Sequence, residues 1–326
     1  MRTLLFLAAL GMAGAASAET PAIIFDMGGK FDKSFNEAAY TGAERYKTET
    51  GTEYREFEIQ NPAQREQALR RLAQRGGDPV VAVGFSQGPA LETVAPEFPD
   101  TRFTIIDMVV DQPNVQSIVF KEHEGSFLVG ALAAIASETG TVGFVGGMDV
   151  PLIRRFACGY EQGAKYVDPD ITVLQNMTGT TPAAWNDPAK GAELAQSQFD
   201  RGADVVFAAA GGTGTGVYQA AADAGKLAIG VDSNQNHLHP GTMLTSMVKR
   251  VDAAVYEAFQ DVAEDTWEPG VKTLGLAEYG VGWALDEHNE PLVTDEMEAR
   301  MLELTGMIGS GEIAVHDYMS DETCTY

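Results

Sequence analysis

Short runs of apolar and β-branched residues alternate with longer segments of helical periodicity along most of the chain. The first helical segment starts at Ser34 and runs to about Glu49, and Glu37 three residues after Ser34 predicts a capping box. The apolar runs predict strands over 22–27, 54–59, 79–83, 102–107, 115–120, 141–146, 171–176, 203–209, 227–231 and 242–247. Further helices are predicted near 62–76, 88–97, 124–138, 152–167, 187–202, 214–225 and 248–265. This alternation predicts an α/β fold with parallel, helix-covered sheets.

A weak internal repeat divides the pattern into two halves. Phe35 and Gly42 recur as Phe156 and Gly163, both at an offset of 121 residues (156 − 35 and 163 − 42). Two lobes of βαβ units explain this better than one long sheet, with a boundary near 121–125. The segment after residue 247 stays unassigned at this point, with a return to the first lobe as one option.

The first eighteen residues have the pattern of a secretory signal peptide. Basic Arg2 precedes an apolar run, and Ala16-Ser17-Ala18 is a small-x-small cleavage pattern, so cleavage is expected before Glu19. No cysteine lies near this site to take a lipid. The mature protein is therefore expected to be exported and soluble.

The net charge of the 326-residue chain limits the kinds of molecule that it can bind. Lys+Arg number 22 against 47 Asp+Glu, for a formal net charge of −25, which argues against nucleic acid and anionic membrane surfaces. A neutral or cationic small ligand is compatible with it. With 2 Cys and 5 His, we expect no metal site. Export permits a disulfide between Cys158 and Cys324, and both the bridge and two free thiols stay open.

Polar residues at the predicted strand ends are candidates for ligand binding, because ligands of open α/β sheets bind beyond the carboxyl ends of the strands. Asp26, Asp107 and Asp232 each end an apolar strand, and a carboxylate there can accept hydrogen bonds from hydroxyl or N–H groups of a ligand. Phe35 and Asn36 open the first helix and offer a stacking face and an amide. Two aromatic residues of the second half could supply the opposing face: Phe207 and Trp185.

Two glycine-rich motifs point to enzymes. Gly84 to Gly88 matches the GxSxG nucleophile elbow, with Ser86 at its centre, after a predicted strand. Because of this place at a strand end, Ser86 is also a possible ligand-binding residue. No HGGG-type segment precedes it and no histidine neighbourhood identifies a triad partner, so a secreted serine hydrolase using Ser86 is the rival hypothesis. Gly212 to Gly216 fails the dinucleotide motif because position 217 is Val217, and no cofactor is expected.

Together these segments resemble the basic membrane protein family, the PnrA-like substrate-binding proteins of ABC transporters. The similarity covers nearly all of the mature chain, and its most specific part is D-x-G-x-x-x-D-x-S-F-N-E, from Asp26 to Glu37. The other segments that carry it are VGFSQGPALETVAPEFPDTRFTIID, EHEGSFLVGALAA, GFVGGMDVPLIRRFACGYEQGA, and GVDSNQ followed by SMVKR.

The resemblance implies a type I periplasmic-binding fold, two Rossmann-like lobes joined by three crossover strands. Lobe 1 would span 19–121 plus about 249–281, and lobe 2 would span 122–248 plus about 282–326. It implies a purine nucleoside as ligand, delivered to permease subunits in the inner membrane. A sugar or another small polar metabolite is the alternative ligand within this class.

The resemblance also implies a role for each site residue. Phe35 and Phe207 would sandwich the base, while Asp26 and Asn36 would address its edge. The ribose hydroxyls would be held by Asp107, Asp232 and Lys249, with Gly211 allowing close backbone approach. Many family members carry a lipid-attachment cysteine at the cleavage site, where this sequence has Ala18 and Glu19, so a freely diffusing periplasmic protein is expected, with a monomer as the default.

Overall fold

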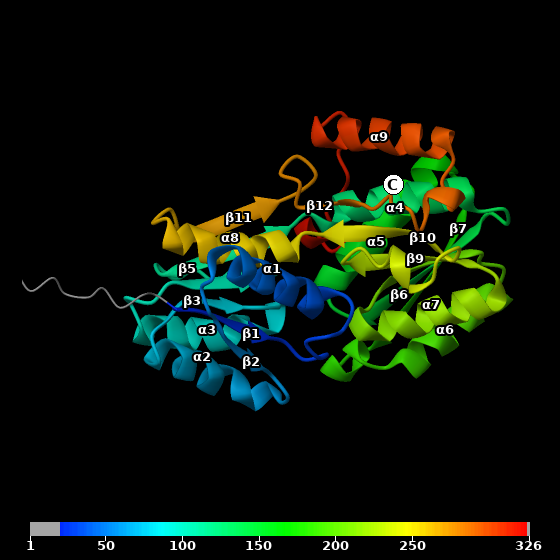
Figure 1. Cartoon of the computed structure of the whole chain (residues 1–326). Helices are drawn as coiled ribbons and strands as arrows, with labels where there is room; N and C mark the ends of the chain where they lie inside the picture. Colours follow the sequence, from blue (N-terminus) through cyan, green and yellow to red (C-terminus); the bar gives the residue numbers. More distant parts are fainter. Residues whose placement is uncertain (1–19, 325–326) are drawn as a thin grey trace, which may run out of the picture.

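The computed structural model describes residues 20–324, which form two α/β lobes, each built on a six-stranded sheet (Figure 1). The expected signal peptide, 1–18, lies outside the described residues. The first sheet has the order β11-β5-β4-β3-β1-β2, and the second has the order β12-β10-β9-β8-β6-β7. Within the second sheet β12 runs antiparallel to β10. Both sheets therefore have the doubly wound order that places strand ends together at one edge.

The lobe 1 elements cover both faces of its sheet. The sheet comprises β1 (Thr20–Phe25), β2 (Arg55–Glu58), β3 (Gly77–Ala82), β4 (Phe103–Ile106), β5 (Val115–Phe120) and β11 (Gly270–Leu274). Its helices are α1 (Phe35–Thr50), α2 (Arg65–Gln74), α3 (Gly88–Val94) and α8 (Val251–Ala263). Along β1, Ile23 and Phe25 pack in the core that includes α1 and α8, whereas Ala22 and Ile24 pack in the core that includes α2 and α3. This alternation explains the continuous apolar run of β1.

Lobe 2 repeats this arrangement. Its sheet comprises β6 (Thr141–Met148), β7 (Thr172–Gly179), β8 (Val205–Ala209), β9 (Leu227–Asp232), β10 (Met243–Lys249) and β12 (Val281–Trp283). Its helices are α4 (Glu122–Ala136), α5 (Pro151–Val167), α6 (Pro188–Asp200), α7 (Gly214–Ala224) and α9 (Asp295–Gly309). Helices α4 and α5 share one core with the sheet, α6 and α7 share the core on its other face, and α9 lies outside α4 (Figure 1).

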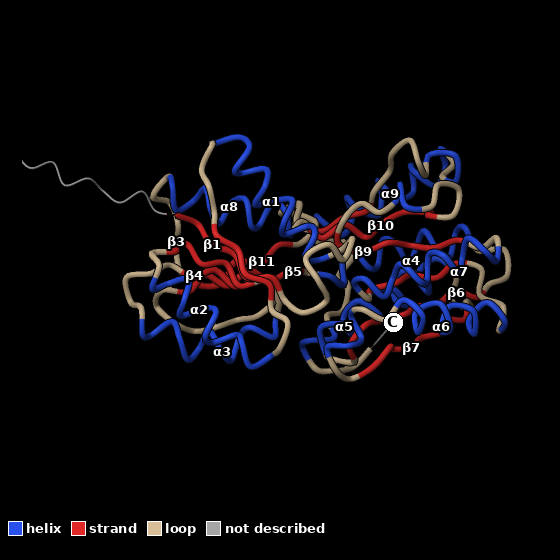
Figure 2. Tube along the Cα trace, turned by 60° about the horizontal axis from the view of Figure 1, so that its bottom comes forward, coloured by secondary structure: helices blue, strands red, loops and turns tan. Residues whose placement is uncertain are grey.

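The described chain passes between the lobes at three places, which Figure 2 shows as the narrow region between the two sheets. The three crossings connect β5 to α4, β10 to α8, and β11 to β12. The segment after residue 247, which the pattern left unassigned, thus supplies α8 and β11 to lobe 1 before it returns to lobe 2.

Two glycines of the internal repeat bring helices into backbone contact. A Cβ atom on Gly42 of α1 would lie 2.1 Å from the carbonyl oxygen of Asp252 of α8. A Cβ atom on Gly163 of α5 would lie 1.9 Å from the carbonyl oxygen of Phe127 of α4. Both positions therefore exclude any side chain, and the repeat reflects equivalent helix packing in the two lobes.

The expected capping box at the start of α1 is wrong. Ser34 makes no side-chain cap to this helix. The carboxylate of Asp32 accepts instead from the backbone N–H groups of Ser34, Asn36 and Glu37, at 2.8, 3.0 and 3.1 Å. A charged acceptor forms stronger hydrogen bonds than a hydroxyl and favours the positive end of the helix dipole. The Ser34 hydroxyl is thereby left to bond elsewhere.

Candidate functional site

A cleft lies where the strand ends of the two lobes face each other, and it holds about 610 Å³ of space, including the part open to solvent. Eight of the ten residues singled out from the sequence line it: Asp26, Phe35, Asn36, Asp107, Trp185, Gly211, Asp232 and Lys249. The other two, Phe207 and Ser86, do not.

Lys249, at the end of β10, is the charged centre of the cleft, with 2% of its side chain exposed. Its Nζ donates to Asp107 Oδ2 at 2.7 Å and forms an ion pair with Glu122 Oε1 at 2.9 Å. Burial lowers the pKa of Lys249, but the carboxylates of Asp107 and Glu122 outweigh burial and raise it overall. Lys249 is therefore a permanent cation that links the two lobes.

Three aromatic rings surround this ammonium group. The centroids of Phe35, Phe120 and Phe156 lie 5.2, 5.0 and 5.7 Å from Nζ. These distances are within the range of cation–π contacts. The apolar wall and the fixed charge thus occupy the same part of the cleft.

Asp107 directly follows β4 and Asp232 is the last residue of β9, and both have left-handed backbone conformations, with φ of +71° and +62°. Burial raises the pKa of each carboxyl to about 6, with Lys249 acting in the opposite direction. Oδ2 of Asp232 accepts from the Ser34 hydroxyl. Oδ1 of Asp107 is buried and has no hydrogen-bond donor within residues 20–324. That atom is free to accept from a ligand.

Asp26 and Asn36 lie at the lobe 1 end of the cleft. Asp26 accepts from Arg65 at 3.1 Å and from the Ser86 hydroxyl. Asn36 Oδ1 accepts from the backbone N–H of Asp26 at 3.0 Å, and its Nδ2 donates to Asp32 at 3.2 Å. The amide of Asn36 therefore joins the start of α1 to the end of β1, and this network fixes how both side chains are presented.

Phe207 is not at the cleft, contrary to the sequence expectation. It lies on β8 with no exposed surface, and its ring packs against Phe144, Tyr160 and Phe156 at 5.5, 5.4 and 6.5 Å between centroids. The strand is buried on both faces, so its apolar run does not reveal which side chains face the ligand. Phe156 of α5 lines the cleft instead, with Phe207 behind it.

The internal repeat contained the signal for Phe156, because it pairs Phe156 with Phe35. Glu122 was also missed. It contacts Lys249 through tertiary structure alone, and no local pattern marks it.

The Ser86 hydroxyl is bonded to a carboxylate rather than to a histidine. Ser86 lies on a 3₁₀ turn, Phe85–Gln87, and its hydroxyl donates to Asp26. None of the residues that line the cleft in the described part of the chain is a histidine. A nucleophilic serine needs a base within hydrogen-bond reach, and the carboxylate that the Ser86 hydroxyl contacts, Asp26, also accepts from Arg65.

Contacts across the cleft hold the lobes together. Besides the bond from Ser34 to Asp232, the Ser233 hydroxyl donates to the Ser34 carbonyl at 3.0 Å. Gln235 Nε2 donates to the Lys33 carbonyl at 2.7 Å. The two lobes are thus closed on the cleft and in direct contact across it.

The structure bonds Cys158 to Cys324, with 5.5 Å between the Cα atoms. The bridge fastens the end of the described chain to α5. Within residues 20–324 no helix combines the length and the apolar composition that crossing a bilayer requires.

Comparison with known proteins identifies relatives of this chain. Residues 20–317 match the family model Bmp, described as "ABC transporter substrate-binding protein PnrA-like". An uncharacterized lipoprotein of Pyrococcus furiosus is 38% identical over 81% of this chain and 70% of its own length. The ABC transporter nucleoside-binding protein BmpA of Lactococcus lactis is 33% identical over 90% of this chain and 88% of its own.

A solved structure agrees with these relatives. The solute-binding protein of an ABC transporter system from Aeropyrum pernix superposes with a TM-score of 0.83 and 31% identity, over 90% of this chain and 92% of its own. The chain and its fold are thus similar to substrate-binding proteins along almost their whole length.

Proposed function

The chain belongs to the Bmp family of PnrA-like ABC transporter substrate-binding proteins, and from this we propose that it captures a nucleoside, with a purine as the preferred base. The ligand would bind between the lobes and pass to the permease subunits of the transporter. The closed form, rather than a chemical step, would be what the permease recognises.

The observation that carries the proposal is the free oxygen of Asp107. Its Oδ1 is buried in the cleft without a donor, while its Oδ2 accepts from Lys249 at 2.7 Å. A buried acceptor without a partner costs about 1–3 kcal/mol. A ribose hydroxyl supplies the missing donor, and Lys249 can donate to a neighbouring ribose oxygen.

The aromatic residues support the base half of the proposal. Phe35 and Phe156 enter the cleft from the two lobes, next to Trp185. A free sugar gains from the carboxylates and Lys249 but has no planar group for these rings. The Lactococcus lactis relative is named a nucleoside-binding protein, which supports the same ligand class.

The test is a binding screen of purified protein that has been unfolded, dialysed and refolded to remove bound ligand. Thermal shift and calorimetry would compare inosine, guanosine, adenosine, uridine, free bases, ribose and other sugars. Binding of purine nucleosides with little response to ribose is expected. A sugar that binds while every nucleoside fails would overturn the ligand and leave the family unchanged.

A matched pair of variants tests whether the carboxylate of Asp107 binds the ligand. Asp107→Asn removes the charge and half of the acceptor capacity at a position whose left-handed backbone Asn tolerates. Asp111→Asn changes an exposed residue of the same loop and serves as control. Nucleoside affinity is expected to fall about tenfold or more in the first variant, by the loss of a charge-assisted hydrogen bond, and to be unchanged in the second.

The proposal also covers the cellular location and the oligomeric state of the protein. The protein would act in the periplasm as a monomer, since opening and closing need no second copy. Osmotic-shock release with its mass measured by light scattering tests both statements, and a stable dimer or a membrane-bound pool would contradict them.

A further inference from the structure

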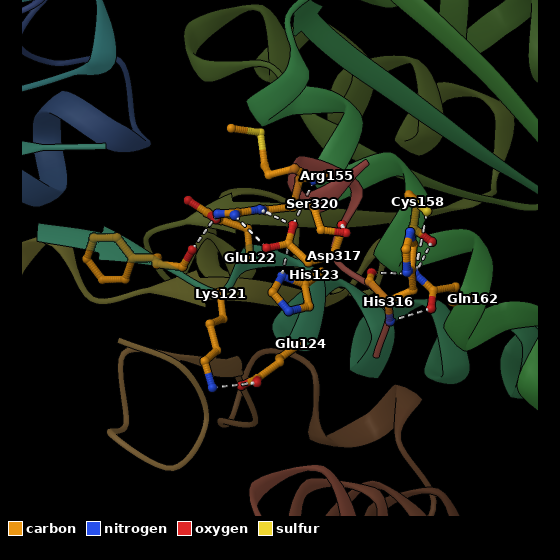
Figure 3. Close-up of polar contacts among 12 residues, drawn as sticks. Lys121, Glu122, His123, Glu124, Arg155, Cys158, Gln162, His316, Asp317 and Ser320 are labelled. Carbon is orange, nitrogen blue, oxygen red and sulfur yellow. Dashed lines mark hydrogen bonds and ion pairs between the residues drawn. The ribbon is translucent and has the colours of Figure 1, made fainter. Parts of the chain in front are cut away.

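The C-terminal segment after α9 contacts the same ion-pair network that holds Lys249. Asp317 accepts from Arg155 of α5 through both carboxylate oxygens, each at 2.7 Å (Figure 3). A bidentate pair of this kind fixes the plane of the guanidinium group. Arg155 is therefore oriented by a residue of the C-terminal segment.

Arg155 in turn bonds to both sides of the crossing between β5 and α4. Its Nη1 donates to Glu122 Oε2 and to the carbonyl of Phe120, both at 2.8 Å. Phe120 ends β5 and Glu122 begins α4, so this one group spans the first crossing between the lobes. The Glu122 side chain is 1% exposed, and Arg155 and Lys249 share its two oxygens.

The two cations determine the state of Glu122. Burial raises the pKa of Glu122, but Lys249 and Arg155 outweigh burial and lower it overall. Glu122 thus stays ionised, and its carboxylate attracts the ammonium group of Lys249 to the crossing between β5 and α4. Without Arg155, a buried carboxylate would lose the partner that satisfies its second oxygen, which is a costly change.

The segment itself is anchored at two further points on α5. Gln162 exchanges two hydrogen bonds with the backbone of His316, at 2.9 and 2.8 Å (Figure 3). The disulfide from Cys158 to Cys324 closes its far end. Asp317 lies between these anchors in sequence, so its carboxylate has little freedom to leave Arg155.

We propose that residues 313–324 act as a positioning strap for the ligand site, in which Asp317 orients Arg155, and Arg155 orients Glu122 against Lys249. The strap lies outside the cleft, so it affects ligand affinity without touching ligand. Because the assay uses inosine as probe, this inference rests on the proposed function.

The experiment compares Asp317→Asn and Arg155→Gln with two neighbouring controls. Arg154→Gln removes an arginine of the same helix, whose bidentate partner is Asp149 at 2.7 and 2.8 Å. Glu312→Gln removes an exposed carboxylate just before the strap. Inosine affinity is measured by calorimetry well below each unfolding midpoint, so that all variants are folded.

Both network variants are expected to weaken inosine binding about tenfold, the size of coupling seen along packed networks. The double variant is expected to lose no more than either single one, and Asp317→Glu to restore most of the affinity. The controls should bind like the parent. A double Cys158→Ser, Cys324→Ser variant is expected to weaken binding by a smaller factor, because Gln162 still holds the segment.

A strap that only stabilises the fold would lower the unfolding midpoint of Asp317→Asn and leave its affinity unchanged, and that result would overturn the proposal. If the parent binds another nucleoside of the screen but not inosine, that nucleoside replaces inosine as the probe. If the parent binds no nucleoside at all, the proposed function fails, and ligand-free crystal structures test the strap separately. The Asp317→Asn structure is then expected to show Arg155 turned away and Lys249 Nζ farther from Glu122 than 2.9 Å. An unmoved Lys249 would contradict the strap.

Discussion

Phe35 and Phe156 approach the ammonium group of Lys249 from the two lobes, with their ring centroids 5.2 and 5.7 Å from Nζ. The two rings are equivalent in the internal repeat, at the helices α1 and α5 that follow the first strand of each lobe. A planar base that binds in this cleft would have one ring available from each lobe.

Replacing either ring tests this arrangement. Phe35→Ala and Phe156→Ala are each expected to weaken nucleoside binding by about 1–3 kcal/mol, the usual contribution of a base stacked on an aromatic side chain. Phe31→Ala is the control, because Phe31 lies in the same loop and is 60% exposed. Calorimetry with inosine measures the loss, and an inosine affinity equal to that of the parent would contradict stacking.

Acidity is expected to weaken binding. The pKa values of Asp107 and Asp232 are raised by burial to about 6, and a ligand hydroxyl donates to the ionised form. Affinity should therefore be constant above about pH 7 and fall as the pH drops through 6, as the carboxyls take up protons. Lys249 stays charged throughout this window because its pKa is raised.

Calorimetry from pH 5 to pH 8 measures this profile. Asp107→Asn should bind more weakly and show a flatter profile, because one of the two titrating groups is gone. Affinity that rises on acidification would show that the carboxyl groups bind the ligand in their protonated form.

Closure depends on the Ser34 hydroxyl, which bonds to Asp232 across the cleft. Ser34→Ala is expected to destabilise the closed state by about 1 kcal/mol, the net value of a typical hydrogen bond. Ligand should dissociate about fivefold faster, with little change in the stability of either lobe. Stopped-flow fluorescence of Trp185, which lines the cleft, can follow release.

Ser310→Ala provides a control at an exposed serine at the end of α9. Equal release rates for the parent and Ser34→Ala would indicate that this bond does not limit opening.

Ester hydrolysis is expected to be absent or independent of Ser86. The hydroxyl is bonded to Asp26, and the residues lining the cleft within the described chain include no histidine that could act as its base. Turnover of a nitrophenyl ester by the parent should equal that of Ser86→Ala. Activity that disappears in the variant would revive the hydrolase hypothesis.

The sequence predicted the fold well where apolar runs are buried on both faces. Strand β5, predicted over 115–120, has those bounds in the structure. Two strands were missed, β11 and β12. The first has mostly exposed or partly exposed residues at the edge of its sheet, and the second has three residues, so neither makes an apolar run that pattern analysis detects.

The site was predictable where topology alone determines position. Parallel strands place Asp26 and Asp107 at the carboxyl edge of the lobe 1 sheet and Asp232 at that of the lobe 2 sheet, and these three residues line the cleft. The choice between Phe156 and Phe207 depended on which face of a fully buried strand meets the ligand. Sequence periodicity carries no information on that choice, and the same holds for the pairing of Glu122 with Lys249.

The glycine contacts of the two helix pairs have a mechanical consequence. Helix α8 starts just after the crossing at β10 and touches α1 at Gly42, while α4 starts just after the crossing at β5 and touches α5 at Gly163. Each of these two linkers therefore leads into a helix that packs closely against a helix carrying an aromatic ring, Phe35 on α1 or Phe156 on α5. Bending of the linkers therefore moves the two rings toward or away from each other together with their helices. The thickness of the group bound between the rings then limits how far the lobes can close.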